Sequence, residues 1–326
     1  MHDDGWLVLT NDDGIEAPLF QSLVKALHER GFPILVLAPA RNHSATGMKI
    51  NLMKPMHIRE RLDLVDTLKL DPHHAPIHFF ELDGTPSDTM IVAFDGGINH
   101  LCPEANPKLV VSGINLGPNM SQDAYHSGTM GAAREAGLYG MPAIATSFTS
   151  FEETGHRVAV DATIQCVEKV WSFLPTHSTN VGRPLGAHFS HFHSSWPNSG
   201  TQHDLETQRG LLRQAFEYGD LMLNVNVPPH WNGTWQATRL GVRWYRNAVT
   251  FSEAGSGEDA MFTIGAASVD YTPVDYGDCD AVEALCASVS CLPVWPETHP
   301  FCLDRHLLAS AVEDTIDGWP AWMVKH

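Results

Sequence analysis

The hydrophobic pattern of the first forty residues predicts a strand, a helix and a second strand. Trp6 to Thr10 is a short apolar run, and apolar residues recur at helical spacing after Pro18. Gly31 suits the end of that helix, and residues 32–38 form a second continuous apolar run. Continuous runs are typical of strands buried on both faces of a parallel sheet, so residues 6–38 are predicted to form a βαβ unit.

The same alternation of strand and helix patterns continues to residue 227. We predict strands at 78–82, 109–112, 141–147 and 221–227, and helices at 87–94, 129–139 and 160–173. Strands that alternate with helices in this way are typical of a doubly wound, mostly parallel sheet. The predicted fold class is therefore α/β with a Rossmann-like layout.

Two parts of the chain depart from this alternation. Residues 174–219 are rich in His, Ser, Pro, Gly and Asn and are predicted to be an irregular surface insertion. Residues 235–271 alternate like antiparallel strands and are predicted to be a β-hairpin excursion, followed by helices at 278–290 and 303–316. The predicted division is an α/β core (1–173 and 220–234), an insertion (174–219) and a C-terminal part (235–326).

Composition and charge narrow the function. Hydrophobic residues make up 43% of the 326 residues and charged residues 18%, which is typical of a globular protein. The formal net charge is -18, from 38 acidic and 20 basic residues, so long nucleic acids are poor candidate partners. A phosphorylated substrate would need a local positive centre, and a divalent cation among carboxylates is the natural source.

The N-terminal sequence, the cysteines and the histidines do not indicate a further functional site. Residues 1–10 lack the pattern of a signal peptide and the chain has no run of 18 apolar residues, which predicts a cytoplasmic protein with no membrane partner. The six cysteines show no zinc-ligand spacing and are predicted to be reduced and mostly buried. The histidines between 187 and 203, including His188, His191, His193 and His203, are predicted to lie on a solvated surface.

The first cluster that carries chemistry is Asn11-Asp12-Asp13-Gly14, directly after the first predicted strand. Ligands of open α/β sheets collect at the carboxyl ends of the strands. Two adjacent carboxylates at such a point repel each other unless a cation joins them, and oxygen ligands suit Mg²⁺, Mn²⁺ or Ca²⁺. The alternative reading is a turn in which an aspartate caps the next helix.

Two more polar clusters fall at predicted strand ends. Residues 41–47 contain Ser44 after the second strand, although loops of this composition are commonly just loops. Residues 112–119 follow a later strand and include Asn115, whose amide oxygen could join a hard cation. Ser127-Gly128-Thr129 opens a predicted helix, where backbone N–H groups can bind phosphate, although a simple helix cap would also explain these residues. Together the three clusters indicate a cation facing a phosphate.

At this point the chain resembles the SurE family, the stationary-phase survival proteins that act as metal-dependent 5'- and 3'-nucleotidases. The resemblance is carried by five ordered motifs: Leu9 to Ile15, Ala38 to Ser44, Leu82 to Asp88, Val111 to Asn119 and Tyr125 to Thr129. It covers residues 6 to 150 well and returns at residues 224–228 and, more weakly, at 270–273.

The resemblance implies a site and an assembly. The implied ligands of one divalent cation per subunit, Mg²⁺, Mn²⁺ or Ca²⁺, are Asp12, Asp13, Ser44 and Asn115. The implied surroundings of the phosphate are Asn11, Asn119, Ser127, Gly128 and Thr129. The family also implies a homodimer or homotetramer in which a C-terminal segment, here within 235–326, crosses to a neighbouring subunit.

The chain departs from the family pattern in three places. Residues 174–219 are longer and more irregular than the usual link, and the tail 293–326 carries no matching motif. Ala40 and His43 stand where an acidic residue and an Arg, Asn or Gln are common, which alters the charge near the metal without removing a ligand.

The resulting hypothesis is a phosphoric monoester hydrolase, a nucleotidase or acid-type phosphatase, that cleaves nucleoside monophosphates by attack of a metal-activated water. The predicted catalytic residues are Asp12, Asp13, Asn119, Ser127 and Thr129. Asp12 or Asp13 would orient the water or take its proton, and Ser127 and Thr129 would stabilise developing charge.

Two alternatives stay open on the sequence. Residues 79–85 resemble the aspartyl-phosphate signature of haloacid-dehalogenase-type phosphatases, with Glu81 at the nucleophile position. The other alternative is a metal-stabilised nucleotide-binding or scaffold protein without turnover. Trp231, Trp235 and Trp244 could stack on a base, but packing is the expected role for large aromatic side chains.

Overall fold

The computed structural model describes residues 5–71, 73–152, 154–176, 178, 180–183, 189–195, 202–252, 261–265 and 268–325. The central sheet has nine strands: β1 Trp6–Thr10, β2 Ile34–Pro39, β3 Ile58–Glu60, β4 Ile77–Leu82, β5 Pro107–Leu116, β6 Ala143–Phe148, β7 Leu221–Val227, β8 Trp235–Thr238 and β13 Ala287–Pro293. The described helices are α1 Pro18–Glu29, α2 Asp63–Thr67, α3 Pro86–Val92, α4 Ile98–Leu101, α5 Asp123–His126, α6 Gly128–Leu138, α7 His156–Trp171, α8 Leu205–Glu217, α9 Asp278–Glu283 and α10 Arg305–Glu313. A π-helical turn, Ala93–Gly97, separates α3 from α4, and a 3₁₀ turn, Ala321–Met323, lies near the C-terminus.

The strand order is β3-β4-β2-β1-β5-β6-β7-β13-β8. Strands β4, β2, β1, β5, β6 and β7 pair in parallel, whereas β3 is antiparallel to β4, and β13 is antiparallel to β7. The direction in which strands are added reverses between β1 and β5, so the crevice at their carboxyl ends is the expected ligand site. The α/β fold class with a doubly wound, mostly parallel sheet is confirmed.

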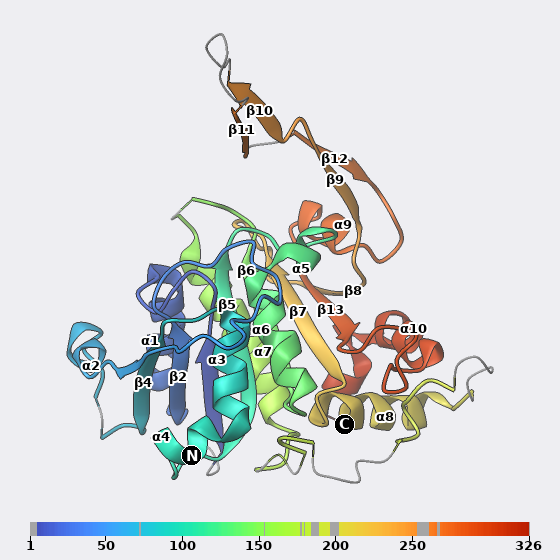
Figure 1. The fold of residues 1–326 in the computed structure, drawn as a ribbon. Helices are drawn as coiled ribbons and strands as arrows, with labels where there is room; N and C mark the ends of the chain where they lie inside the picture. Colours follow the sequence, from blue (N-terminus) through green and yellow to red (C-terminus); the bar gives the residue numbers. More distant parts are fainter. Residues whose placement is uncertain are drawn as a thin grey trace.

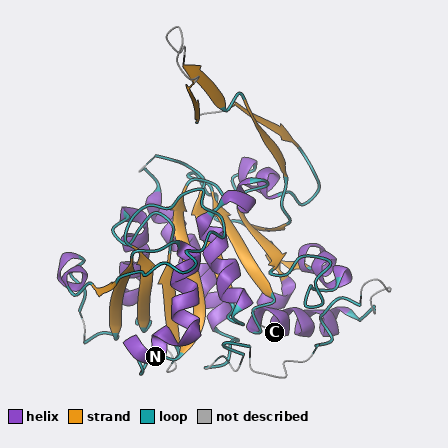
Figure 2. Cartoon of the chain, in the orientation of Figure 1, coloured by secondary structure: helices purple, strands orange, loops and turns teal. Residues whose placement is uncertain are grey.

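Helices cover both faces of the sheet (Figures 1 and 2). One hydrophobic core includes the buried faces of α1, α7, α8 and α10, and the other lies under α3 and α6. Leu7 and Leu9 of β1 belong to the first core and Val8 to the second, because successive side chains of a strand point to opposite faces. This double burial explains the continuous apolar runs of the sequence.

The predicted strands and helices up to residue 173 are present with shifted ends, and β7 has the predicted bounds. Within 174–219 the structure differs from the expected irregular insertion, because residues 205–217 form α8. Asp204 caps this helix by accepting from the Thr207 backbone N–H at 2.9 Å. Leu212 and Phe216 are buried on one face of α8, so packing stabilises a helix that the surrounding polar residues obscure in the sequence.

The predicted helix at 278–290 is only half correct. Helix α9 ends at Glu283, and residues 287–293 instead form β13 inside the sheet. Leu285 has a left-handed φ of 60°, and the Cys286 N–H donates back to the Ala281 carbonyl at 2.9 Å. This arrangement closes a helix in the way a C-terminal cap does. The predicted last helix is shorter than expected, as α10, and is followed by a two-residue pair, β14 Thr315–Ile316 and β15 Trp319–Pro320.

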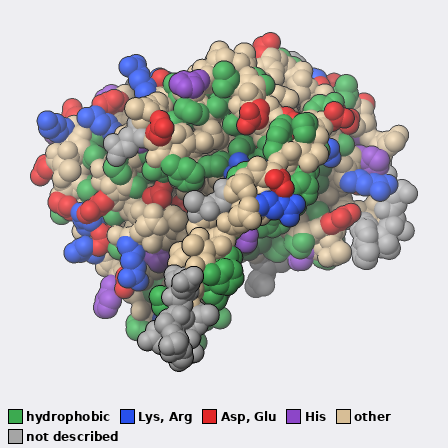
Figure 3. All heavy atoms as spheres, turned by 90° about the horizontal axis from the view of Figure 1, so that it is seen from above, with side chains coloured by type: hydrophobic (Ala, Val, Ile, Leu, Met, Phe, Trp, Pro, Cys, Tyr) green, Lys and Arg blue, Asp and Glu red, His purple; other side chains and the backbone are tan. Residues whose placement is uncertain are grey.

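An antiparallel arm leaves the body of the molecule (Figure 1). It contains β9 Val242–Arg246 paired with β12 Ser268–Thr272, and beyond them β10 Val249–Ser252 paired with β11 Met261–Ile264. This arm is the antiparallel excursion expected from the sequence, but the prediction began it too early, because residues 235–238 form β8 in the central sheet, parallel to β13. Its hydrophobic side chains are visible from above in Figure 3. Phe251, Met261, Phe262 and Ile264 are all exposed by more than half of their surface.

The structure also bears on the predictions made for the cysteines, the histidines and the tryptophans. All six cysteines are described and free, and five of them are buried. His188 lies outside the described residues, and His191 is exposed as expected. His193 is instead only partly exposed: its side chain is 5% exposed, and its Nε2 lies 3.0 Å from Asp220 Oδ2. Trp235 packs face to face against Trp319, which agrees with a packing role. Among the described residues no helix combines the length and apolarity that crossing a membrane requires.

Candidate active site

The two acidic residues of the first cluster lie at the carboxyl end of β1, beside the end of β5. Thr10 of β1 is paired with Ser112 of β5, so the loop after β1 and the last residues of β5 share one edge of the sheet. The Asp12 carbonyl accepts from the His43 N–H at 2.6 Å, which brings in the loop after β2. Segments from three predicted clusters therefore meet where the strand order reverses.

Asp12 is buried against the start of α6. Its Oδ2 accepts from the Thr129 backbone N–H at 3.0 Å, and its Oδ1 accepts from the Thr129 hydroxyl at 2.5 Å. The helix N-terminus favours a negative charge at this position. Gly128 allows the close approach, because a Cβ there would stand 2.8 Å from Asp12 Cβ and 2.9 Å from Oδ2.

Burial raises the pKa of Asp12 to about 6, and the neighbouring Asp13 charge adds to this effect while the Thr129 hydrogen bonds oppose it. Burial also raises the pKa of Asp13. Both carboxylates are thus held where their negative charge is poorly solvated. A cation placed between such groups removes that cost and favours their ionised form.

Asp13 joins the other two clusters. Its Oδ2 accepts from the Leu116 backbone N–H at 3.2 Å, next to Asn115, and its Oδ1 accepts from the Asn42 side chain at 3.1 Å. The Ser44 side chain lies near the Asp13 carboxylate and opposes the rise of its pKa. Asp13 is only half-buried and Ser44 is exposed, so this side of the site faces solvent.

Asn115 lies in β5 with its amide group fixed in direction. Its Nδ2 donates to the Gly117 carbonyl at 2.7 Å, which leaves the amide oxygen as the group available to a ligand. The structure thus connects Asp13 with Ser44 through Asn42, which accepts from the Ser44 N–H at 2.8 Å, and with Asn115 through the adjacent Leu116. Asp12 is connected to Asp13 along the chain and to Thr129 across it.

The phosphate-side residues are held in three different ways. Asn11 is fully buried and its Nδ2 donates to the Gly14 carbonyl at 2.8 Å, while its Oδ1 has no hydrogen-bond partner among the described residues. Ser127 caps α6 by accepting from the Met130 N–H at 3.0 Å. Both donors of Thr129 are taken by Asp12, so Thr129 contacts the acid and not an open anion pocket.

Asn119 lies toward β6 and β7. Its Nδ2 donates to the Ser147 hydroxyl at 2.8 Å, and its backbone N–H donates to Asn226 Oδ1 at 2.9 Å. The Asn224 side chain donates to the Asn119 carbonyl at 2.9 Å. The described hydrogen bonds tie Asn119 to these strands and not to either aspartate.

Sequence reasoning missed several supporting residues. Asn42 lies in a loop whose composition gives no sign of its partner, and Ser147 carries no pattern of its own. The signal for Asn224 and Asn226 was their spacing, because residues two apart on a strand point to the same face. Both are fully buried at the end of β7, where an asparagine needs a hydrogen-bond partner.

The residues present fit a hard divalent cation. Two poorly solvated carboxylates, one hydroxyl and one oriented amide oxygen are the donor types that Mg²⁺, Mn²⁺ and Ca²⁺ take. The unpartnered Asn11 oxygen is a further polar atom buried at the same strand end. An aspartate that only capped a helix would not explain the second carboxylate, which receives donors from both β5 and the loop after β2.

The haloacid-dehalogenase-like segment has a different role. Glu81 is buried in β4 and forms ion pairs with Arg59 and with Arg61, the latter at 2.5 Å. A carboxylate engaged by two guanidinium groups is a poor nucleophile. Thr85 accepts from the Asp88 N–H at 3.2 Å and caps α3.

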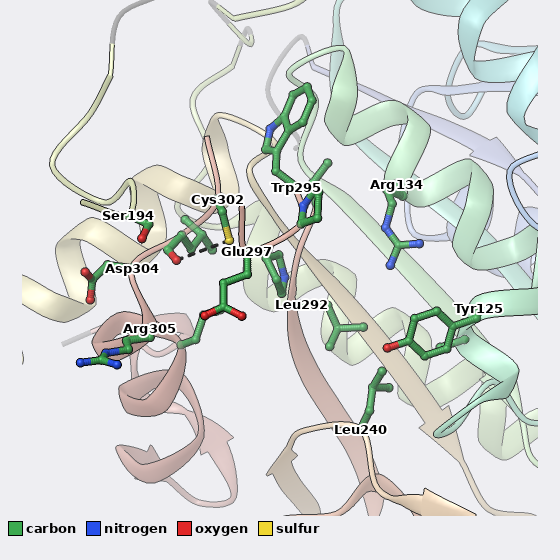
Figure 4. Close-up of a pocket in the computed structure, with 16 residues that line it drawn as sticks. Tyr125, Arg134, Ser194, Leu240, Leu292, Trp295, Glu297, Cys302, Asp304 and Arg305 are labelled. Carbon is green, nitrogen blue, oxygen red and sulfur yellow. Dashed lines mark hydrogen bonds between the residues drawn. The ribbon is translucent and has the colours of Figure 1, made fainter. Parts of the chain in front are cut away.

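A cavity of about 900 Å³ lies next to the aspartate site, between α6, β13 and α10. Figure 4 shows Tyr125 of α5 and Arg134 of α6 on one side, and Asp304 and Arg305 on the other. None of the sequence-predicted site residues lines it. The cavity therefore neighbours the aspartate site through α5 and α6 and is separate from it.

Several known proteins are similar to this chain. A family model described as survival protein SurE matches residues 7–247. A protein named 5'-nucleotidase SurE from Heliobacterium modesticaldum is 37% identical over 316 residues, which cover 96% of this chain and 92% of that protein. Another of the same name from Desulforudis audaxviator is 31% identical over 306 residues, which cover 86% of this chain and 95% of that protein.

A solved structure shows the same relationship. The crystal structure of a SurE protein from Aquifex aeolicus is 25% identical to this chain, covers 89% of this chain and 93% of its own, and superposes with a TM-score of 0.60. With the family model matched over most of the length, this chain belongs to the SurE family.

Proposed function

We propose that this protein is a divalent-metal-dependent phosphomonoesterase that hydrolyses nucleoside monophosphates, a 5'/3'-nucleotidase. The observation that carries the proposal is the pair Asp12 and Asp13 at the switch point of the sheet. Each carboxylate is fixed by donors from a different element, Asp12 by α6 and Asp13 by the end of β5 and the loop after β2. The names of the relatives support the nucleotide as substrate.

The cation would be held by Asp12, Asp13, Ser44 and Asn115. When bound, a divalent cation supplies Lewis acidity toward the phosphate and lowers the pKa of a water that serves as nucleophile. Asp12 is the anchor, because its position is set by two hydrogen bonds from a helix N-terminus. Ser44 is supported as a ligand because it lies in the same loop as Asn42, which bonds to both Asp13 and the Ser44 N–H, and because its side chain opposes the rise of the Asp13 pKa.

The remaining residues would orient the phosphate and handle the proton. Asp13 is the more exposed of the two acids and is the one placed to orient a water molecule or take its proton. Asn11, Asn119, Ser127 and Gly128 would surround the phosphate at the start of α6, where backbone N–H groups favour anions. Thr129 would act through Asp12, because both of its donors already serve that carboxylate.

A nucleoside monophosphate panel tests the proposal. Purified protein is assayed for released phosphate with 5'- and 3'-monophosphates and p-nitrophenyl phosphate, in Mg²⁺, in Mn²⁺ and after EDTA. We expect turnover that EDTA abolishes and added cation restores, and a loss of at least about 100-fold in kcat for Asp13→Asn. Nucleotide binding without turnover in every cation would overturn the enzyme assignment in favour of a binding or scaffold protein.

We also propose that the arm formed by β9, β10, β11 and β12 contacts a second copy of this chain, giving a homodimer or homotetramer. The arm carries the cross-strand pair Phe251 and Phe262, exposed by 73% and 62%. Exposed apolar side chains on an element that leaves the body are typical of an interaction surface.

A further inference from the structure

A second group of metal-ligand side chains lies at the amino ends of the parallel strands, opposite the carboxyl ends where the aspartates lie. His78 is near the start of β4, Cys102 follows α4, and Glu104 precedes β5. The starts of parallel strands meet at the edge away from their carboxyl ends. Figure 1 accordingly shows α4 at the lower end of the sheet, far from the loops above it.

The three side chains converge on one point. One ligand atom from each of His78, Cys102 and Glu104 lies within 4.8 Å of the other two. His78 Nε2 is 3.1 Å from Glu104 Oε1, and the Cys102 thiol lies beside the same carboxylate. Glu104 thus faces an imidazole and a thiol at once.

A carboxylate and two aromatic rings lie around the imidazole of His78. Its other nitrogen, Nδ1, lies 4.0 Å from Glu60 Oε1 on β3. The ring also stacks between Trp6, at a centroid distance of 5.9 Å, and Phe80, at 6.4 Å. At 4.0 Å Glu60 is too far for a hydrogen bond, but a carboxylate on this side is the usual support of a metal-binding imidazole, and a shift of about 1 Å would bring it into range.

We propose that His78 Nε2, Cys102 Sγ and a Glu104 carboxylate oxygen form a second cation site, selective for Zn²⁺ over Mg²⁺, with its fourth position open to water. The nitrogen and thiolate donors favour zinc, whereas the all-oxygen set of the aspartate site favours hard cations. The two sites would therefore discriminate between metals by ligand chemistry.

The required movement is small. Tetrahedral zinc with the usual bond lengths separates its nitrogen, sulfur and oxygen ligands by roughly 3.3 to 3.6 Å. The three ligand atoms here lie within 4.8 Å, so a contraction of about 1 Å completes the site. Glu104 is exposed and His78 is half-buried, so these two side chains can supply the movement toward the buried Cys102. On binding, the thiol proton leaves to solvent and bonds to the cation replace the contact between His78 and Glu104.

The competing explanation is a purely structural cluster. A surface His–Glu pair contributes little to stability and is common without any metal. The structural explanation predicts that the cluster binds no thiophilic ion, whereas our proposal predicts that it does. The distinction therefore rests on whether the sulfur becomes a ligand.

Co²⁺ is the probe, because a cobalt–thiolate bond gives a strong charge-transfer band in the near ultraviolet that oxygen ligands do not. Full-length protein carrying Asp12→Asn and Asp13→Asn, which weaken the other site, is titrated with Co²⁺ and then with Zn²⁺ or Mg²⁺. We expect a saturable thiolate band that Zn²⁺ removes and excess Mg²⁺ does not. Absence of the band would overturn the proposal.

Single substitutions in the same background locate the ligands. Cys102→Ser should abolish the band, while Cys286→Ser, which alters a more exposed thiol beside Asn232 and Thr234, should leave it unchanged. Exposed Glu104→Gln, which avoids any folding defect at the buried cysteine, should weaken Co²⁺ binding at least 10-fold, and Glu60→Gln by about 10-fold. A band that survives Cys102→Ser, or unchanged affinity in Glu104→Gln, would contradict the assignment.

Discussion

Thr129 gives both of its hydrogen-bond donors to Asp12, its backbone N–H at 3.0 Å and its hydroxyl at 2.5 Å. The two residues are 117 positions apart, and the contact fastens the end of β1 to the first turn of α6. Because both carboxylate oxygens are engaged on one side, their remaining lone pairs point in fixed directions. The first residue of the proposed cation site is thus set in place by a helix and not by the loop that contains it.

Thr129→Val tests this relationship while keeping the backbone donor. The carboxylate loses a hydrogen bond worth about 1.5 to 3 kcal/mol to a charged group, so we expect Mn²⁺ affinity to fall about 10- to 100-fold. Calorimetric titration with Mn²⁺ measures the change. Thr163→Val is the control, because it removes an equally buried hydroxyl that contacts only Thr146 among the described hydrogen bonds. Equal losses in both variants would show that the effect is general destabilisation.

Gly128→Ala should disable the site by a steric route. The new Cβ would stand 2.8 Å from Asp12 Cβ and 2.9 Å from its Oδ2, closer than real Cβ atoms come. Asp12 must move away, and misplacing a catalytic group by about 1 Å costs on the order of 100-fold in rate. Gly210→Ala in α8 is the matched control, because nothing lies within 4 Å of its Cβ position. Phosphatase assays that showed equal kcat for the two variants would refute the close packing.

The pH dependence of stability should reveal Glu135 on α6. Burial, helped by the charge of Asp88, raises the pKa of this carboxyl to about 7. Folding therefore favours the neutral form of Glu135. The stability that this preference contributes is fully present below the unfolded pKa of about 4.3, and it is lost as pH rises through the folded pKa of about 7. Glu135→Gln should be more stable than the parent protein by on the order of 2 kcal/mol at pH 8 and nearly equal to it at pH 5.

Thermal melts at pH 5 and pH 8 check this sign. Glu313→Gln, at an exposed position on α10, should shift neither melting temperature by more than a small amount. A destabilised Glu135→Gln protein at pH 8 would show that the carboxylate has a partner that favours its charged form.

Most of the parallel core could be predicted from the sequence, because its strands are continuous apolar runs. Leu7, Val8 and Leu9 are all fully buried, so the apolar run of β1 has no polar interruption. The order of the strands also brings the predicted acidic cluster beside Asn115. Local pattern and tertiary position agree in this part of the chain.

The parts that escaped prediction depend on contacts between distant segments. The α8 helix is stabilised by packing Leu212 and Phe216 into the first hydrophobic core, and its sequence neighbours are polar. The role of Thr129 could not be read from a helix-cap pattern, because its partner is Asp12 in the loop after β1. His193 was expected at the surface, yet its acceptor, Asp220, lies 27 positions away and is itself buried. Spacing along the chain carries no information about such partners.

The arm should control assembly through its exposed aromatic pair. Phe251 and Phe262 lie opposite each other on β10 and β11 with ring centroids 6.1 Å apart. Replacing both by Asp puts two like charges on a surface that we propose to be buried in the oligomer, and burying them without partners is unfavourable. We expect the double variant to shift toward monomer in light-scattering chromatography, by at least 10-fold in dissociation constant. Leu62→Asp adds a charge at a similarly exposed position, 68%, before α2, and should leave the assembly unchanged. An oligomer that persists in the arm variant would place the subunit contact elsewhere on the molecule.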